Sequence, residues 1–195
     1  MIDIVSLIKT AGYVGIFGLV FAESGLLIGI FFPGDSLLFT AGILASQGYG
    51  HIAILALVGA VAAITGDSTG YWLGRKFGPR VFTRTDSFFL DRAHIERAQR
   101  FYDRYGAKTI ILARFVPIVR TLAPVLAGVG SMDYGTFITY NIIGGLVWGA
   151  GLPLAGYCLG NAIPNIDHYL LPIIALIVVV SVLPAVYHFW LERKK

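Results

Sequence analysis

The sequence predicts an all-α membrane protein, a polytopic helical bundle formed by one domain over residues 1–195. The chain is 56% hydrophobic and only 13% of its residues are charged, well below the quarter that is usual in soluble domains, and its mean hydropathy is +0.76. Apolar runs at 52–66, 137–160 and 169–189 approach or exceed the roughly 20 residues that cross a hydrocarbon core. A soluble protein with a single core would not contain them.

The expected elements follow in order along the chain. Residues 1–23 form an N-terminal helix, which stays as an anchor because it lacks the basic, apolar and small-residue order of a removed signal peptide. The other regular elements are a transmembrane helix at 51–74, a cytoplasmic amphipathic segment at 75–108, and transmembrane helices at 135–160 and 169–190. Within 75–108, apolar side chains at helical spacing predict a surface helix between Asp91 and Gly106. A connector helix packed only on protein remains the alternative.

Two remaining segments, 24–46 and 109–131, are expected to be re-entrant hairpins that enter and leave the membrane on the same side. A helix between Glu23 and Asp35 covers only about 16 Å, half of a bilayer, and Pro33 breaks it, because proline removes a backbone donor. An alternative stays open for the first segment, in which 11–32 and 35–58 are complete spans.

The second segment repeats the construction of the first, because Pro117 and Pro124 interrupt it. The distribution of positive charge predicts the side of the membrane to which each segment opens. All fifteen lysines and arginines avoid 46–51 and 161–168, so by the positive-inside rule these two stretches lie outside, while 75–108 and the C-terminal ERKK lie in the cytoplasm. The two hairpins then open to opposite sides. This is an inverted repeat, a plan typical of secondary transporters.

Five ionisable residues stand in apolar surroundings, and each costs roughly 2.5 to 3.5 kcal/mol at a bilayer centre. We expect them to face a cavity or one another, and ion pairs that pin the two hairpins together are the structural alternative to a functional site. Asp67 is the weakest candidate, because Arg75 two turns away offers it a local role. The five are Glu23, Asp35, Asp67, Arg114 and Arg120.

The chemistry of these residue types predicts an anion site. Arginine presents a rigid fork of donors to phosphate or carboxylate, and the break at Pro117 would let Arg114 and Arg120 converge on one anion. Thr121 and Ser36, each next to a charged residue, complete the expected substrate-binding set.

Glu23 and Asp35 are expected to couple the site to protons, because a buried carboxylate beside arginine can alternate between an ion pair and a bound proton. Asp67, Pro33 and Pro117 are secondary candidates. The coupling ion is expected to be H⁺, with Na⁺ as the alternative, and no cofactor is expected.

Other functions lack their sequence signals. The chain has no phosphate-binding loop for nucleotides, and its histidines lack zinc-ligand spacing, so neither a metal site nor an enzyme is expected. No separate basic domain exists for nucleic acid. The expected partners are membrane lipids, and a homo-oligomer stays open.

Glycines and aromatic residues predict packing and membrane interfaces. Glycines recur every four residues from Gly66 to Gly78, which permits close helix approach. Tyr71, Trp72 and Trp190 are expected in aromatic belts at the membrane surface.

Four motifs resemble those of the DedA family of integral membrane proteins, whose VTT domain is shared with eukaryotic lipid scramblases. The resemblance covers nearly the whole chain, from about Tyr13 to Trp190. The motifs are FAESGLLIGIFFPGDSLLFTAG at 21–42, GDSTGYWLGRKFG at 66–78, FYDRYGAKTIILARFVPIVRTLAPVLAG at 101–128 and GSMDYGTFITYNIIGGLVWG at 130–149.

The resemblance implies a VTT fold with two facing re-entrant hairpins, in a bacterial cytoplasmic (inner) membrane with both termini in the cytoplasm. It implies lipid movement, since members of the family translocate undecaprenyl phosphate or are linked to the proton-motive force. The family's functional positions match Glu23, Asp35, Arg114 and Arg120. We therefore expect a proton-coupled transporter of a lipid phosphate. A passive scramblase, or a scaffold that binds a partner through Arg97 and Arg100, are the alternatives.

Overall fold

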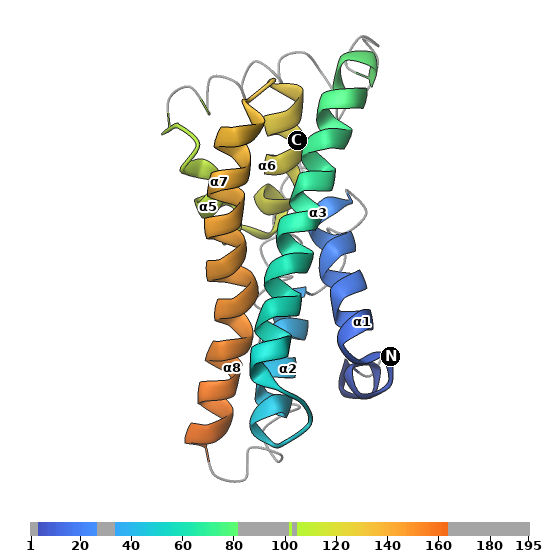
Figure 1. The fold of residues 1–195 in the computed structure, drawn as a ribbon, viewed down its shortest axis with the longest axis vertical. Helices are drawn as coiled ribbons and strands as arrows, with labels where there is room; N and C mark the ends of the chain where they lie inside the picture. The colour runs from blue at the N-terminus through green and yellow to red at the C-terminus, as the bar shows by residue number, and fades with distance from the viewer. Residues whose placement is uncertain (1–3, 27–33, 82–101, 103–104, 164–195) are drawn as a thin grey trace, which may run out of the picture.

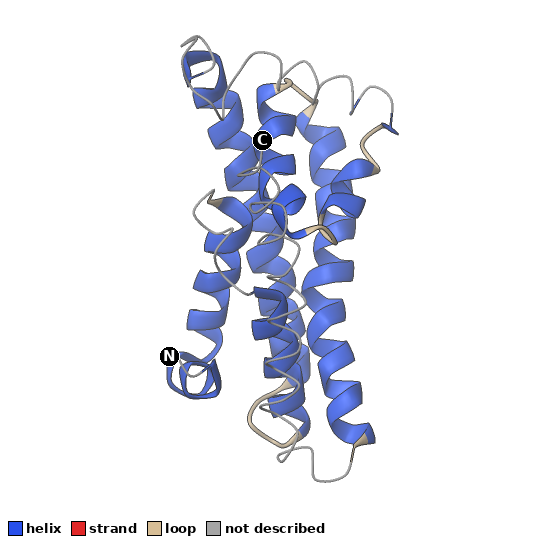
Figure 2. Cartoon of the chain, turned by 180° about the vertical axis from the view of Figure 1, so that it is seen from behind, coloured by secondary structure: helices blue, strands red, loops and turns tan. Residues whose placement is uncertain are grey.

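The computed structural model describes residues 4–26, 34–81, 102 and 105–163, and this part is helical, with no strand (Figures 1 and 2). Pro33, Arg97, Arg100, Trp190 and the predicted helix at 169–190 lie outside the described residues. The helices are α1 (Ile4–Gly25), α2 (Gly34–Ser46), α3 (Ile52–Val81), α5 (Thr109–Ala113), α6 (Pro117–Val129), α7 (Tyr134–Gly145), the π-helical turn η2 (Leu146–Ala150) and α8 (Gly151–Ala162).

Two long antiparallel helices frame the bundle. The first is α3, and the second is the continuous run of α7, η2 and α8 (Figure 1). Each contains a stretch long and apolar enough to cross a membrane, Ile52–Gly78 in the first and Tyr134–Ala162 in the second. The two helices approach closely at Gly59 and Gly149, where a side chain on either residue would overlap the backbone of the other. Glycine therefore sets the distance between the long helices.

The short helices α2 and α6 start in the middle of the bundle and run toward opposite ends (Figure 1). Each has 13 residues, about 20 Å of helix, which is too short to cross a bilayer. α6 runs parallel to α3, since Gly74 packs on Val125 and Gly78 on Val129. α2 runs parallel to α8. Because the long helices are antiparallel, α2 and α6 point in opposite directions.

Helix α1 packs against α3 through Gly25 and Gly66, which touch backbone to backbone. It bends at Gly12, whose φ of 57° lies in the left-handed region that glycine adopts readily. After α2, a turn through Gly48 and Gly50, both with positive φ, separates it from α3. The alternative of one complete span over 35–58 is therefore wrong.

The end of one helix and the continuity of another differ from the sequence expectation. α3 continues to Val81, beyond the predicted end at residue 74, because its glycines keep packing on α6 as far as Gly78. Pro124 does not interrupt α6, and its ring lies against Gly70 of α3. Packing on α3 thus keeps helical a segment that proline alone would weaken.

The glycines of the four-residue repeat do lie at helix contacts, as predicted, whereas one aromatic prediction is wrong. Tyr71 is fully buried, stacks on Phe137 with ring centroids 4.6 Å apart, and donates its hydroxyl to the Met132 carbonyl at 2.5 Å. It belongs to the core, while its neighbour Trp72 is exposed. The α3–α6–α7 contacts leave Tyr71 no access to an interface.

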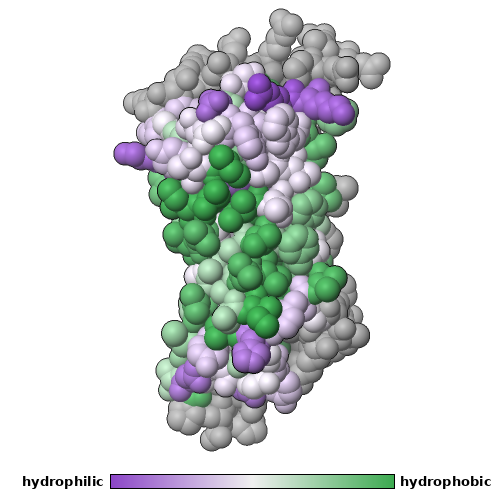
Figure 3. Space-filling view, viewed as in Figure 1, coloured by the Kyte–Doolittle hydropathy of each residue, from purple (hydrophilic) through white to green (hydrophobic). Residues whose placement is uncertain are grey.

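The surface is that of a protein embedded in a membrane. Apolar side chains form a broad band across the middle of the face in Figure 3, with hydrophilic residues gathered toward both ends. Large exposed apolar side chains on the long helices include Leu57, Leu146, Val147 and Leu154. Lipid tails are the solvent that suits such a band.

Candidate functional site

Arg120 lies where three helix ends meet. It stands in the first turn of α6, and its guanidinium contacts Glu23 in the last turn of α1 and Asp35 in the first turn of α2. Nη1 donates to Asp35 Oδ1 at 2.5 Å, and Nη2 pairs with Glu23 Oε1. Two carboxylates therefore share one cation in the middle of the bundle.

Local backbone structure puts these side chains in place. Val116 is extended and Pro117 begins α6, where its fixed φ suits a first helical position. This break directs Arg120 to the meeting point. Gly34 leaves room for the Glu23 carboxylate, because a Cβ at position 34 would overlap it.

Trp148 of η2 completes the Arg120 cluster. It is almost fully buried, and its indole Nε1 donates to Asp35 Oδ1 at 2.8 Å. The Arg120 Cζ lies 4.9 Å from the ring centroid, which is a cation–π contact. One side chain thus contacts both members of the Asp35–Arg120 pair.

Arg114 forms a second centre. It follows α5 in the break before α6, is 4% exposed, and its Nη2 lies 2.6 Å from Asp67 Oδ2 of α3. The same Nη2 also donates to Asn141 Oδ1 of α7. Asn141 in turn donates to the Ile64 carbonyl at 2.9 Å and to Ser68 Oγ at 3.2 Å. Asn141 therefore links Arg114 to the backbone of α3.

Arg114 and Arg120 were expected to converge on one anion, and in the structure they pair with different carboxylates. The local role expected for Asp67 is wrong. Its partner is Arg114, while Arg75 donates to the Tyr71 hydroxyl at 3.0 Å.

Several buried polar atoms near these centres have no hydrogen-bond partner in the described part of the chain. They include the Ser36 and Thr121 hydroxyls, which were predicted to bind substrate, the Thr40 hydroxyl, Glu23 Oε2 and Arg114 Nε. An orphaned buried donor or acceptor costs about 1–3 kcal/mol. Such atoms are candidates for contact with a ligand or water.

The sequence prediction missed Asn141, Trp148 and Thr40. Asn141 and Trp148 carry hydrogen-bonding groups inside the apolar run 137–160. They are seven residues apart, which is about two helical turns. Thr40 lies one turn after Ser36, on the same face of α2. These spacings were the available signals.

The charges of the two centres do not balance. With every group ionised, the three carboxylates of Glu23, Asp35 and Asp67 and the two guanidiniums carry a formal net charge of −1. An anionic ligand can enter such a cluster only if one of the carboxylates moves away or takes a proton. Among the described residues, no three His, Cys, Asp or Glu side chains are grouped to hold a metal.

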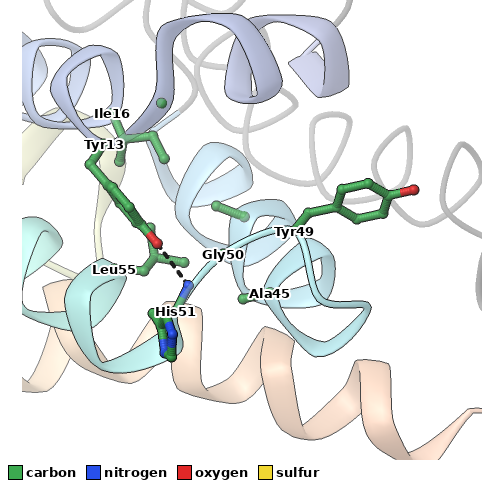
Figure 4. A pocket seen from close by; sticks show the side chains of 9 residues that line it. Tyr13, Ile16, Ala45, Tyr49, Gly50, His51 and Leu55 are labelled. Carbon is green, nitrogen blue, oxygen red and sulfur yellow. Dashed lines mark hydrogen bonds between the residues drawn. The ribbon is translucent and has the colours of Figure 1, made fainter.

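A pocket of about 360 Å³ lies away from these charges, where Tyr13 of α1, the end of α2 and the start of α3 meet (Figure 4). The Tyr13 hydroxyl accepts a hydrogen bond from the His51 backbone N–H at 2.7 Å. Ile16, Ala45 and Leu55 give the pocket apolar walls. None of the five charged residues lines it, so it is separate from the candidate anion site.

Comparison with known proteins identifies the family. The VTT domain family matches residues 32–158, and the chain is 44% identical over 176 residues to Protein DedA of Escherichia coli strain K12, covering 89% of this chain and 80% of that protein. The chain belongs to the DedA family.

Two further relatives match this chain over a similar length. An uncharacterized membrane protein of Mycobacterium tuberculosis is 46% identical over 173 residues, which is 88% of this chain and 75% of that protein. One from Synechocystis is 35% identical over 162 residues, 80% of this chain and 71% of that protein. No solved structure matches. Together with the apolar helices, these relatives make this DedA-family chain a bacterial membrane protein.

Proposed function

We propose that this protein moves a phosphate-bearing lipid across the bacterial cytoplasmic membrane, and that Arg120 binds the phosphate. The observation that carries the proposal is the position of Arg120, held between Glu23 and Asp35 where α1, α2 and α6 end in the middle of the bundle. Burying ionic groups at that depth costs free energy. This cost favours a functional role for the cluster over a purely structural one.

Exchange of anions on Arg120 gives the transport step. A lipid phosphate replaces one carboxylate on the guanidinium fork, which binds phosphate bidentately. Because the cluster already carries a formal net charge of −1, one of the two carboxylates takes a proton as the phosphate arrives. The proton supplies the unequal affinity for two states that transport requires, so proton-motive force drives the cycle.

Two helix N-termini support anion binding at the same place. α2 and α6 both begin there, and backbone N–H groups at a helix N-terminus favour negative charge. The unpartnered hydroxyls of Ser36 and Thr121, one on each helix, are available as further donors to phosphate oxygens. In the membrane, 24–46 and 109–131 would be the two re-entrant hairpins, with both termini in the cytoplasm.

Undecaprenyl phosphate is the substrate we propose. Its terminal phosphomonoester offers three oxygens that two helix ends and a guanidinium can contact together, whereas a phospholipid diester offers two. Recycling of this carrier lipid is then the role of the protein.

Transport in proteoliposomes tests the function. Reconstituted protein should move labelled polyprenyl phosphate between leaflets, and Arg120→Ala should abolish this while Lys76→Ala, an exposed cation at the end of α3, keeps it. Unchanged movement in Arg120→Ala would reject the role of Arg120.

A pH gradient separates the proton-coupled transporter from a passive scramblase. A coupled transporter should accumulate the labelled lipid in one leaflet when the gradient is imposed. A scramblase would equilibrate the lipid to the same distribution with or without the gradient.

A further inference from the structure

The two carboxylates on Arg120 are held differently. Asp35 Oδ1 accepts from Arg120 Nη1 at 2.5 Å and from Trp148 Nε1 at 2.8 Å. The indole N–H does not reach Glu23, whose carboxylate has the backbone N–H of Gly34 beside it. If Arg120 moved away, Asp35 would keep one charge-assisted hydrogen bond from the protein.

The Asp35 side chain is also more exposed to water than the Glu23 side chain. The Asp35 side chain is 25% exposed and the Glu23 side chain only 2%. A carboxylate that leaves its cation needs water or another donor. Asp35 has both the indole N–H and contact with water, whereas Glu23 is shielded from water, so releasing Asp35 from Arg120 costs less than releasing Glu23.

Trp148 is fixed well enough to serve as that donor. It lies in the π-helical turn η2, a kind of irregularity that is frequent at functional sites. The next residue, Gly149, packs directly on the backbone of Gly59 in α3, so η2 cannot shift without breaking the contact between the two long helices. The indole therefore stays at the cluster while Arg120 moves.

We propose that Asp35, and not Glu23, yields Arg120 to the lipid phosphate, and that Trp148 is the positioning residue that holds Asp35 when it does. This inference rests on the proposed function. Charged groups that face Asp35 are Glu23 from α1 and Arg120 from α6, with the Arg114–Asp67 pair as the second centre. Trp148 acts through Asp35 and does not itself bind the phosphate.

Replacing Trp148 by phenylalanine tests the proposal, because it removes the N–H and keeps a ring on Arg120. The probe is farnesyl phosphate, titrated onto detergent-solubilised protein at one fixed pH. In the free protein Asp35 Oδ1 accepts from both Arg120 and Trp148, and the indole bond is the one that remains once Arg120 binds phosphate. Trp148→Phe should therefore bind about tenfold more weakly than wild type.

The matched control is Trp72→Phe, which alters an exposed tryptophan of α3 outside the cluster and should bind as wild type does. In an Asp35→Asn background the Trp148→Phe effect should disappear, and in a Glu23→Gln background it should persist. Binding by Trp148→Phe that equals the Trp72→Phe control would overturn the proposal.

The outcomes distinguish this inference from the proposed function. If wild type does not bind farnesyl phosphate, or if Arg120→Ala binds it equally well, the proposed function fails. If wild type binds, Arg120→Ala does not, and Trp148→Phe matches wild type, only the role of Trp148 fails.

A measurement on wild type covers the case in which Trp148→Phe does not fold. The chain has three tryptophans, so ¹⁵N-indole spectra can be assigned with Trp72→Phe and Trp190→Phe. The Trp148 N–H signal should stay protected from water exchange when farnesyl phosphate saturates the protein. Rapid exchange on binding would mean that Trp148 releases Asp35, contrary to the proposal.

Discussion

Arg114 and Asp67 form a buried ion pair, with Nη2 and Oδ2 2.6 Å apart, although 47 positions separate them in the chain. Asn141 of a third helix accepts from the same nitrogen. The pair therefore ties the break before α6 to both long helices. Arg120 is instead shared by two carboxylates, the buried Glu23 and the partly exposed Asp35.

Removing one partner of the Arg114–Asp67 pair should destabilise the fold. Asp67→Asn leaves Arg114 buried with its charge uncompensated, and we expect a loss of about 3–5 kcal/mol. Thermal unfolding in detergent measures it. The double variant Arg114→Met, Asp67→Leu should recover much of the loss, and a double variant no more stable than Asp67→Asn would contradict a simple ion pair.

Asn141→Leu should also lower stability. It removes one of the two acceptors of Arg114 Nη2 and the amide that donates to the Ile64 carbonyl and to Ser68 Oγ. We expect a loss of about 2–3 kcal/mol, since a hydrogen bond to a charged group is among those lost. Ile142→Leu, at an exposed neighbouring position, is the control and should leave the unfolding temperature unchanged.

Gly34→Ala should impair transport with little effect on helix content. The added methyl group would overlap the Glu23 carboxylate and push it from Arg120. Labelled-lipid movement in proteoliposomes measures the loss, which should be at least tenfold. Gly18→Ala is the matched control, because nothing lies within 4 Å of its added Cβ and alanine favours helix by about 0.5–1 kcal/mol. Equal transport by the two variants would argue against a steric role for Gly34.

Tyr102 should stay protonated to unusually high pH. Burial raises the pKa of its phenol, and the hydroxyl donates to the Ala123 carbonyl of α6 at 2.7 Å. Because the raised pKa means that the folded state favours the protonated form, this contact stabilises the protein below the ordinary tyrosine pKa of about 10 and is lost as pH rises through the folded value. Tyr102→Phe should cost about 1 kcal/mol at neutral pH.

Alkaline unfolding of wild type and Tyr102→Phe measures this contribution. The stability difference between the two proteins should be constant at neutral pH and shrink only at strongly alkaline pH. Tyr105→Phe, an exposed tyrosine nearby, provides the comparison. A difference that vanishes near neutral pH would contradict a protonated, buried phenol.

Features that depend on local spacing and composition could be predicted from the sequence alone. Apolar runs predicted an all-α membrane protein, and proline chemistry predicted the break at Pro117 that puts Arg120 at a helix start. The four-residue glycine repeat predicted the close contacts of α3. Each depends on residues within a few turns of one another, so helical periodicity and backbone sterics are sufficient to predict it.

The pairing of the buried charges, in contrast, depends on how the helices pack. Asp67 and Arg75 lie on the same helix, and their spacing suggested a local contact. In the folded protein Arg75 donates to the Tyr71 hydroxyl instead. Packing of α3 against α6 and α7 brings Arg114 to Asp67. Trp148 lies 113 positions from Asp35 in the chain, so no local pattern connects them. The pairing energy of buried ions depends on distance and on exclusion of water, and these quantities exist only once the helices have packed.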